Sequence, residues 1–354
     1  MITSIRLQNF RSYRDDSFEF EPGVNIIVGP NASGKTNLME AVLVLCEGSS
    51  YRARDPELIK FKKPWTRLDG YFDKSTRSLK IEYREGSLEK TYLFDEKTYK
   101  RVGLDKTVPV VYFEPNHLQL ITRGPDARRD YMDDLLARSR PQFKPLANNY
   151  KRTLAQRNAL LKRGPGYGQQ QLFAWDIRLS ELGELIARAR QELTDDINKN
   201  LSATYSQIAH SKTKVSLEYK SQFPADNYGS RMLSKLEATA QADFERGFTG
   251  HGPHREDFAV DIAAQPANIT ASRGENRSLM LALKVYELDL IERSRGISPI
   301  FLLDDVFSEL DGARRKALVE FLKDRQTIIT TTDADTVVDY FATGNHRIIP
   351  LQKD

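Results

Sequence analysis

Apolar and polar residues alternate near the N-terminus, as expected for a strand that buries one face. This pattern predicts strands at 2–10, 17–20 and 24–28, and then a helix over 34–45, where apolar residues recur at helical spacing. Further strands are expected at 69–72, 79–83, 91–94 and 108–113. The first third of the chain is therefore predicted to be α/β and rich in short strands.

The pattern becomes helical between about residues 116 and 210, where β-branched runs give way to Leu, Ala, Arg, Gln and Glu. Two apolar seams at helical spacing run through 143–161 and 179–208. The helix-breaking segment Gly164–Gly168 separates them. We predict an antiparallel helical hairpin that forms a lobe of its own.

The α/β pattern returns towards the C-terminus. It predicts helices at 230–244, 275–292 and 313–322, and strands at 215–219, 258–262, 300–303, 327–331 and 346–350. The simplest architecture is one α/β domain built from both ends of the chain, with the helical lobe inserted between them.

A phosphate-binding motif lies directly between the third predicted strand and the first helix. The octapeptide 29–36 matches G-x-x-x-x-G-K-[ST], in which backbone N–H groups and a helix N-terminus surround phosphates. Lys35 is expected to reach the β- and γ-phosphates of ATP and to act in catalysis, and Thr36 to offer its hydroxyl to Mg²⁺. A bare glycine-rich turn is the alternative, which the flanking strand and helix disfavour. The predicted ATP-binding residues are Gly29, Pro30, Asn31, Ala32, Ser33, Gly34, Lys35, Thr36 and Asn37.

Two adjacent acids, Asp304 and Asp305, end the apolar strand 300–303. Beside a phosphate-binding loop, Asp304 can hold Mg²⁺ and Asp305 can orient or deprotonate the attacking water. A solvated acidic turn is the alternative, and the sequence does not settle which acid has which role.

A serine turn, Ser272-Arg273-Gly274-Glu275, opens the helix that precedes this strand. Taken alone it is a capping box. Its position between the phosphate-binding loop and the acidic pair, with the segment 308–311 (SELD) after them, is the order found in ATP-binding-cassette (ABC) ATPases. In those proteins the serine turn of one subunit covers the γ-phosphate held by another, so Ser272 and Gly274 are expected to contact ATP bound to a second copy.

Taken together, the motifs resemble the bacterial RecF family of recombination and repair proteins essentially end to end. The matching strings are Asn9-Phe10-Arg11, the segments 29–37, 272–275 and 303–311, and His251-Gly252-Pro253-His254-Arg255-Glu256-Asp257. General ABC ATPases and SMC proteins lack the part of the last string that begins at Gly252. The resemblance implies an α/β ABC-type P-loop ATPase head, formed by residues 1–115 and 246–354, with a helical second lobe at 116–245. It also adds Arg11 to the nucleotide site.

The same resemblance implies a function. Two subunits would close on ATP and hold double-stranded DNA near single-strand gaps, and slow ATP hydrolysis would release it. RecR and RecO are the implied partners in loading a recombinase.

The sequence departs from ABC ATPases at three places. Asp305 stands where many have Glu, which favours slow turnover. The strand 327–331 is followed by no His but ends in the run Thr330-Thr331-Thr332-Asp333, so one of these threonines is the candidate sensor of the γ-phosphate. Gln119 is a candidate Q-loop residue, with a plain surface glutamine as the alternative.

Charge and cysteine content bear on three further questions: nucleic-acid binding, disulfide formation and zinc binding. In 354 residues, 53 basic side chains against 49 acidic ones give +4, which permits a nucleic-acid-binding patch without requiring one. Lys60, Lys62 and Lys63 lie in a basic, aromatic-rich segment and are the DNA-binding candidates, with a solvated face as the alternative. The single cysteine, Cys46, excludes an intramolecular disulfide and a Cys-based zinc site, and Gly252-Pro253 argues against zinc at His251 and His254.

The absence of an apolar run of about 20 residues and of a signal-peptide pattern predicts a cytoplasmic protein.

Two other classes of protein share the ATP chemistry: the nucleotide-binding subunit of a membrane transporter and the ATPase part of an ATP-dependent nuclease. The helical hairpin and the 252–257 segment oppose a transporter subunit, and no segment remains for the extra domain of an ATP-dependent nuclease.

Overall fold

The structure is a computed structural model that describes residues 1–164, 169–333, 335–341 and 346–352. The chain divides into two compact units. Unit 1 comprises residues 1–118 and 287–354, and unit 2 comprises residues 119–286. Within the described residues, no helix is both long enough and apolar enough to cross a membrane.

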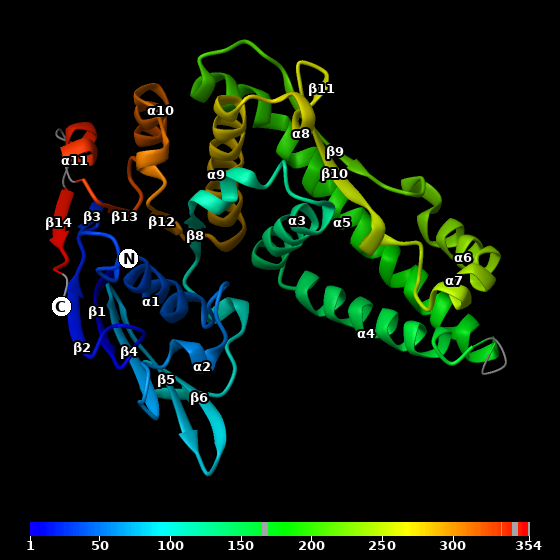
Figure 1. Ribbon diagram of the computed structural model, residues 1–354, viewed down its shortest axis with the longest axis horizontal. Coiled ribbons are helices and arrows are strands. Elements are labelled where there is room, and N and C mark those ends of the chain that lie inside the picture. The colour runs from blue at the N-terminus through cyan, green and yellow to red at the C-terminus, as the bar shows by residue number, and fades with distance from the viewer. Residues whose placement is uncertain (165–168, 334, 342–345, 353–354) are drawn as a thin grey trace. The chain divides into compact units, whose positions relative to one another are not determined.

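A five-stranded parallel sheet carries the chemistry of unit 1 (Figure 1). Every residue of its strands β12 and β13 is buried, as expected for central strands covered on both faces. In spatial order the strands are β14 (His346–Pro350), β3 (Val24–Val28), β13 (Thr327–Thr331), β12 (Ile300–Asp304) and β8 (Val110–Phe113).

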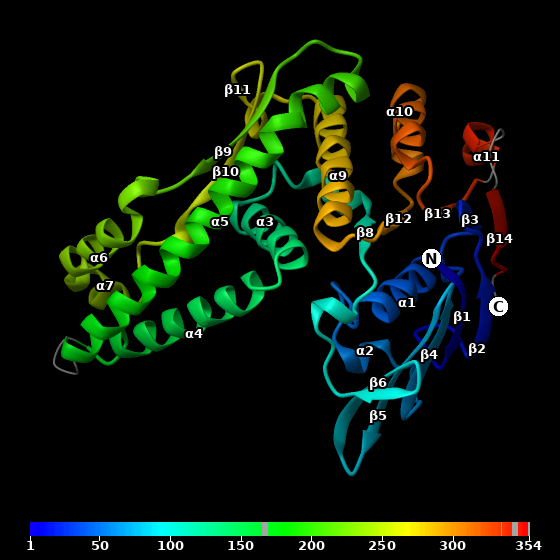
Figure 2. The ribbon, with the colours of Figure 1, turned by 180° about the vertical axis from the view of Figure 1, so that it is seen from behind.

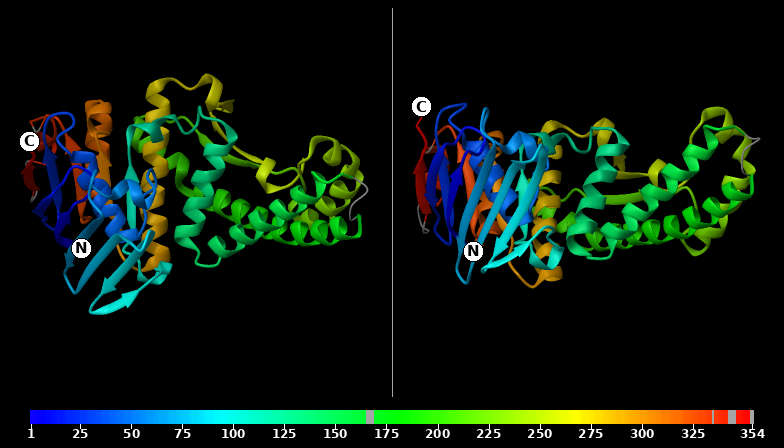
Figure 3. Two further views of the ribbon diagram at one scale, coloured as in Figure 1. Left: turned by 60° about the horizontal axis from the view of Figure 1, so that its bottom comes forward. Right: turned by 90° about the horizontal axis from the view of Figure 1, so that it is seen from below.

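A six-stranded antiparallel sheet forms the other half of unit 1, and its strands run side by side in the right-hand view of Figure 3. Helix α1 (Lys35–Glu47) packs on both sheets and is buried along most of its length. The antiparallel strands in spatial order are β2 (Asp15–Glu19), β1 (Ile2–Gln8), β4 (Trp65–Phe72), β5 (Ser75–Arg84), β6 (Ser87–Phe94) and β7 (Lys97–Tyr99).

The remaining helices of unit 1 are α2 (Asp55–Leu58), α10 (Gly312–Leu322) and α11 (Asp335–Phe341). Short 3-10 turns occupy Leu104–Lys106, Pro115–Gln119 and Phe307–Glu309.

The phosphate-binding motif follows the carboxyl end of β3, and the acidic pair lies at the carboxyl end of β12. Both are parallel strands, and α/β sheets bind ligands at this edge.

Unit 2 is built on the long helix α5 (Gln169–Ala209), which lies alongside α4 (Phe143–Leu161) in Figures 1 and 2. A three-stranded antiparallel sheet, ordered β11 (Gln265–Pro266), β10 (Asp257–Ile262) and β9 (Val215–Lys220), packs on α5 through β9. The other helices are α3 (Pro125–Ser139), α6 (Tyr228–Ala238), α7 (Ala240–Arg246) and α8 (Ala267–Thr270), with 3-10 turns at Ala225–Asn227 and Pro253–Arg255. Helix α9 (Arg273–Arg295) begins in unit 2 and ends in unit 1, because the units divide after residue 286.

The predicted helical hairpin is confirmed as α4 and α5, although most of its predicted breaker, residues 165–168, lies outside the described residues. The predicted helix at 230–244 is two helices, because the backbone of Thr239 leaves the helical conformation with φ −106° and ψ 9°. The compact units also divide the chain differently from the predicted lobes. Residues 246–286 pack with the helical region, since β10 pairs with β9 and Asp257 at its start pairs with Arg128 of α3.

Candidate nucleotide site

The phosphate-binding motif forms the turn between β3 and α1. Gly34 precedes the helix with φ 97°, and Tyr13 Oη donates a hydrogen bond to its carbonyl at 3.1 Å. A Cβ at Gly34 would lie 2.8 Å from that hydroxyl, so both backbone and space favour glycine here. The first turn of α1 has no side-chain cap and no acidic residue, so its positive end is available to an anion.

Lys35 and Ser33 give this turn its polar chemistry. Lys35 is buried, and its Nζ donates to the carbonyls of Gly29 at 2.8 Å and Pro30 at 3.1 Å. Ser33 Oγ is buried and has no hydrogen-bond partner among the described residues. A buried hydroxyl without a partner is costly, and a bound phosphate oxygen would satisfy it. These residues therefore fit a phosphate group.

Asp304 ends β12 beside the helix that carries Thr36. Its Oδ1 accepts hydrogen bonds from Thr36 Oγ1 at 3.2 Å and from Thr330 Oγ1 at 2.8 Å. Its Oδ2 accepts from Tyr112 Oη at 2.8 Å. Mg²⁺ prefers one or two protein oxygens, with phosphate and water supplying the other ligands, so the pair of Thr36 and Asp304 fits it.

Asp305 follows in the left-handed region, with φ 54°, a strained conformation that is common at functional sites. Its backbone N–H donates to Thr330 Oγ1 at 2.9 Å, so Thr330 joins the two acids. Burial raises the pKa of the Asp305 carboxyl, Lys35 opposes that rise and Asp304 adds to it. A raised pKa makes Asp305 a better proton acceptor than an exposed aspartate.

Arg11 contacts a residue of α1. Its guanidinium makes two hydrogen bonds to the buried Glu40 carboxylate, at 2.8 and 3.0 Å. Ser50 Oγ also donates to Glu40, at 2.6 Å, and Arg52 lies 3.5 Å from it. Burial opposes ionisation of Glu40, but the bonds from Arg11 and Ser50 outweigh it and leave its pKa below the usual value. Nearby, Asn37 Nδ2 donates to Ser12 Oγ at 3.0 Å.

Tyr112 and Tyr51 are neighbours of the site that the sequence motifs missed. Tyr112 lies on β8, where it reads only as one of four buried strand residues. Its ring centroid is 4.6 Å from that of Tyr51, whose hydroxyl donates to Glu114 at 2.8 Å. No spacing rule links residues 51, 112 and 304, so these contacts emerge only in the folded chain.

The serine turn lies in unit 2 and is the expected capping box. Ser272 N and Oγ both donate to Glu275 at 2.8 Å, and Glu275 N donates to Ser272 Oγ at 3.2 Å. These bonds from Ser272 lower the pKa of Glu275. Ser272 is exposed, Gly274 is partly buried at the first turn of α9, and Gln119 is exposed.

The predicted DNA-binding lysines differ in their surroundings. Lys60 Nζ donates to the Ser12 carbonyl and is partly buried. Lys62 and Lys63 are exposed, and Lys62 Nζ lies 5.5 Å from the centroid of the Phe61 ring. Phe61 is 84% exposed. Lys62 and Lys63 are therefore the two ammonium groups that face solvent.

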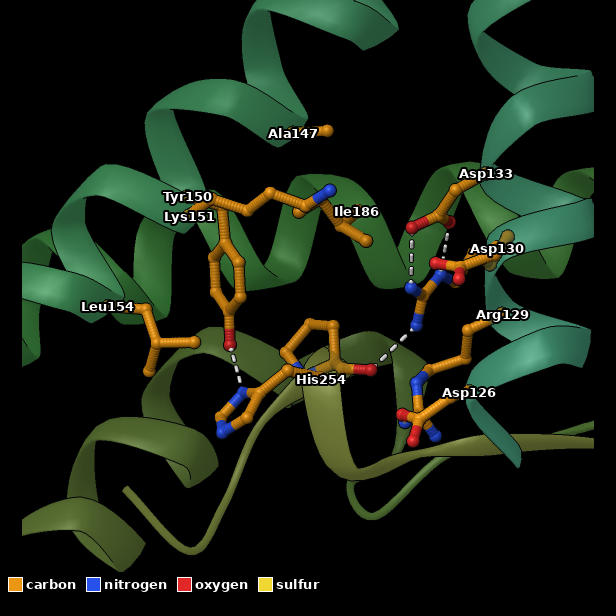
Figure 4. Close-up of a pocket in the computed structure, with 12 residues that line it drawn as sticks. Asp126, Arg129, Asp130, Asp133, Ala147, Tyr150, Lys151, Leu154, Ile186 and His254 are labelled. Carbon is orange, nitrogen blue, oxygen red and sulfur yellow. Dashed lines mark hydrogen bonds and ion pairs between the residues drawn. The ribbon is translucent and has the colours of Figure 1, made fainter. Parts of the chain in front are cut away.

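The segment 252–257 is a structural junction of unit 2. Tyr150 and His254 line a cavity of about 190 Å³ together with residues of α3 and α5. Figure 4 shows the Tyr150 hydroxyl directed at the His254 ring, to which it is hydrogen-bonded. Arg190 of α5 donates to the Pro253 carbonyl at 2.7 Å, and Glu256 accepts from Tyr228 at 2.9 Å and from Gln222 N at 2.9 Å.

No group of three or more His, Cys, Asp or Glu within the described residues could hold a metal ion. Cys46 is buried, which raises its pKa to about 12.

His254 is neutral in this junction. Its Nε2 faces the Thr249 carbonyl at 3.1 Å and must carry the proton, so Nδ1 accepts from Tyr150 Oη at 2.8 Å. Burial lowers the pKa of His254 to about 4, although the bond to Thr249 opposes this.

A pH dependence of stability follows from His254. Its pKa is lower in the folded than in the unfolded chain, so the unfolded chain takes up the proton first as pH falls, and stability declines between about pH 6.5 and 4. For this partly buried group we expect a loss of about 1–2 kcal/mol between pH 7.5 and 5. Urea unfolding across this range should show a shallower decline in His254→Gln; equal slopes would contradict the assignment.

The parallel sheet, the phosphate-binding turn and the acidic pair define the class, a P-loop head domain of the kind shared by RecF and SMC proteins. The model of the RecF/RecN/SMC N-terminal domain family matches residues 1–346. The chain is 33% identical over 345 residues to the DNA replication and repair protein RecF of Desulfitobacterium hafniense, covering 94% of this chain and 93% of the relative. It is 35% identical over 344 residues to RecF of Heliobacterium modesticaldum, covering 94% of this chain and 92% of that relative. The chain belongs to the RecF family.

Solved structures agree with this assignment. The recombination mediator protein RecF in the RecFOR pathway, solved with ATPγS, superposes with a TM-score of 0.85 at 30% identity, covering 95% of this chain and 94% of that one. RecF with ATP gives 0.83 at 29% identity, covering 94% and 92%. An SMC head bound to the C-terminal winged-helix domain of ScpA gives 0.55 at 17% identity, over 96% and 91%, and supports the fold alone. The predicted fold class and family are thus confirmed.

Proposed function

We propose that this chain is an ATP-gated DNA-binding protein of recombinational repair. The observation that carries the proposal is the convergence, in one site, of three features: the Lys35 ammonium, the Thr36–Asp304 pair and the Ser33 hydroxyl, which has no partner among the described residues. Relatives solved with ATP and ATPγS support ATP as the nucleotide.

Each residue of the site then has a role. Residues 29–37 surround the phosphates, with Lys35 neutralising their charge and Ser33 donating to an oxygen. Thr36 and Asp304 would hold Mg²⁺, which supplies charge neutralisation at the transferred phosphoryl group. Asp305, whose pKa is raised, accepts the proton of the attacking water, and Thr330 fixes its backbone relative to Asp304. Arg11, which the family resemblance adds to the nucleotide site, is paired with Glu40 of α1.

Hydrolysis is proposed to be slow and to regulate binding. Two copies would close on two ATP molecules and grip double-stranded DNA near gaps, and turnover would release it. The RecFOR pathway of the solved relatives supports joint action with RecR and RecO in recombinase loading. An ATPase head and a helical second lobe remain part of this proposal, although compact unit 2 extends to residue 286 rather than to the predicted 245.

Dimer formation tests the role of the serine turn. Ser272→Arg removes the cap and adds bulk and charge at the N-terminus of α9, without touching residues 29–37. We expect ATP affinity to stay within about twofold while ATP-induced dimers are lost, measured by light scattering and by binding of a fluorescent ATP analogue. Arg273→Ala, one position along, is the control. Equal dimer formation by Ser272→Arg and the parent protein would overturn the serine contact across the interface.

DNA binding tests the lysine segment. Lys62→Glu/Lys63→Glu should weaken duplex binding and reduce the slope of log affinity against log salt by up to about two, because each lost phosphate contact accounts for about one unit. Adding Lys60→Glu should change the slope less, because its ammonium is already bound to the Ser12 carbonyl. Titrations with and without ATP provide the measurement. Lys74→Glu/Lys97→Glu, two exposed lysines of the antiparallel sheet and its turns, carries the same charge change and should bind like the parent.

A further inference from the structure

The Asp304 carboxylate is held from both sides. It is 5% exposed, and its Oδ1 receives the hydroxyls of Thr36 and Thr330. Its Oδ2 receives only the Tyr112 hydroxyl, at 2.8 Å, among the hydrogen bonds of the described residues. A buried carboxylate needs hydrogen-bond donors on both oxygens, and the Tyr112 hydroxyl is the donor that satisfies Oδ2 and fixes its position.

We propose that Tyr112 is a positioning residue that orients the Asp304 carboxylate for a divalent cation, an inference that rests on the proposed nucleotide function. The Tyr112 hydroxyl fixes Oδ2, so Oδ1 is the carboxylate oxygen that lies beside the Thr36 hydroxyl. The cation would then be bound by one carboxylate oxygen, Oδ1, and by the Thr36 hydroxyl. The terminal torsion of an aspartate is broad, so without the Tyr112 bond only the hydroxyls of Thr36 and Thr330 on Oδ1 restrain the carboxylate, and Oδ2 can turn about them. Groups that hydrogen-bond to metal ligands commonly change metal affinity 10- to 100-fold.

Tyr112 is itself held in place by a second aromatic residue. The Tyr51 ring lies against it, and the Tyr51 hydroxyl donates to Glu114 at 2.8 Å, directly after β8. Glu114 also accepts from Asn116 Nδ2 at 3.2 Å. Tyr51 therefore keeps the Tyr112 ring from moving away from Asp304.

The segment that carries Tyr51 is fixed on its other side as well. Ser50 and Arg52, the two neighbours of Tyr51, both contact the buried Glu40 of α1. The segment 50–52 thus connects α1, which begins at Lys35, to the strand next to the acidic pair. A role confined to packing would require the Tyr112 ring but not its hydroxyl.

The hydroxyl can be tested alone with Tyr112→Phe. Binding of a fluorescent ATP analogue is titrated with Mg²⁺, starting in EDTA, and thermal melting is recorded in parallel. We expect unchanged binding in EDTA, and a Mg²⁺ concentration for half-maximal enhancement that is about tenfold higher than in the parent. Tyr92→Phe is the matched control, since Tyr92 is also buried in unit 1 and its hydroxyl donates to the Gly48 carbonyl at 2.9 Å. It should lower the melting temperature without moving the Mg²⁺ midpoint.

The outcomes separate the two proposals. An unchanged Mg²⁺ midpoint in folded Tyr112→Phe, with normal binding by the parent, overturns the role of Tyr112 and leaves the proposed function standing. A parent protein that binds no nucleotide with or without Mg²⁺ overturns the proposed function and the inference together. Should Tyr112→Phe fail to fold, Tyr51→Phe carries the test, with a smaller rise of the midpoint in support and an unchanged midpoint against.

Discussion

Lys35→Met is expected to abolish ATP binding while the protein stays folded. The substitution removes the buried ammonium that bonds the Gly29 and Pro30 carbonyls and would neutralise the phosphates, but keeps a side chain of similar length. Lys35 is expected to contact both the β- and the γ-phosphate, and the loss of two charge-assisted contacts of about 1.5–3 kcal/mol each corresponds to at least about 100-fold in affinity. Anisotropy of a fluorescent ATP analogue measures the loss.

The control is Lys63→Met, which removes an exposed lysine of the same unit and should bind ATP as the parent does. Thermal melting of both variants checks the fold, because the loop carbonyls that lose Lys35 can turn to water. Micromolar ATP binding by folded Lys35→Met would contradict the assignment of residues 29–36 to the phosphates.

The parts of the site that could be predicted are those encoded by neighbouring residues. The motif 29–36 carries its own turn and helix start, and the acidic pair ends a strand whose apolar run is unmistakable. Ser272 and Glu275 form the capping box that their spacing of three predicts. In each case the physical cause lies within one turn or one strand.

What could not be predicted depends on residues brought together from afar. Tyr112 and Asp304 are 192 positions apart, and no periodicity relates them. The same holds for Arg128 and Asp257, whose ion pair helps to place the chain after residue 245 with unit 2. Local pattern also failed at Thr239, where two helices meet without a proline or glycine to mark the break.

The segment 252–257 illustrates both sides of this division. Its resemblance to the RecF family can be identified from the amino-acid sequence alone, but the residues that it contacts cannot be predicted from that sequence. His254 meets Tyr150 of α4, while Glu256 meets Tyr228 of α6 and Asp257 meets Arg128 of α3. A string that distinguishes the family is thus a junction of elements within unit 2.

A second buried junction gives the largest expected effect on stability. Arg157 of α4 is fully buried and donates to Asp176 of α5 at 2.5 Å, to Asp243 of α7 at 2.7 Å and to Thr249 at 2.9 Å. Both carboxylates are buried too, and burial already raises the pKa of Asp176 against the opposing pull of Arg157. The guanidinium is therefore the cation that faces both carboxylates, which water cannot reach.

Arg157→Met should destabilise unit 2 by about 3–5 kcal/mol, because it leaves two buried carboxylates without a cation. Trp175 packs beside Leu160, Leu161 and Leu172, so its fluorescence in a Trp65→Phe background reports urea unfolding of this region. The matched control is Arg178→Met, which breaks an exposed ion pair with Glu181 at 3.0 Å and should cost less than about 1 kcal/mol.

The charge argument can be separated from loss of packing. Arg157→Met combined with Asp176→Asn and Asp243→Asn has the same missing guanidinium but no uncompensated carboxylate, so it should recover more than half of the lost stability. The single variant should also lose less stability at pH 5 than at pH 7.5, since protonation neutralises carboxyls whose pKa rises once Arg157 is gone. A loss below about 1 kcal/mol would contradict the importance of Arg157 to unit 2. A triple variant no more stable than Arg157→Met would mean that packing rather than charge compensation makes Arg157 important.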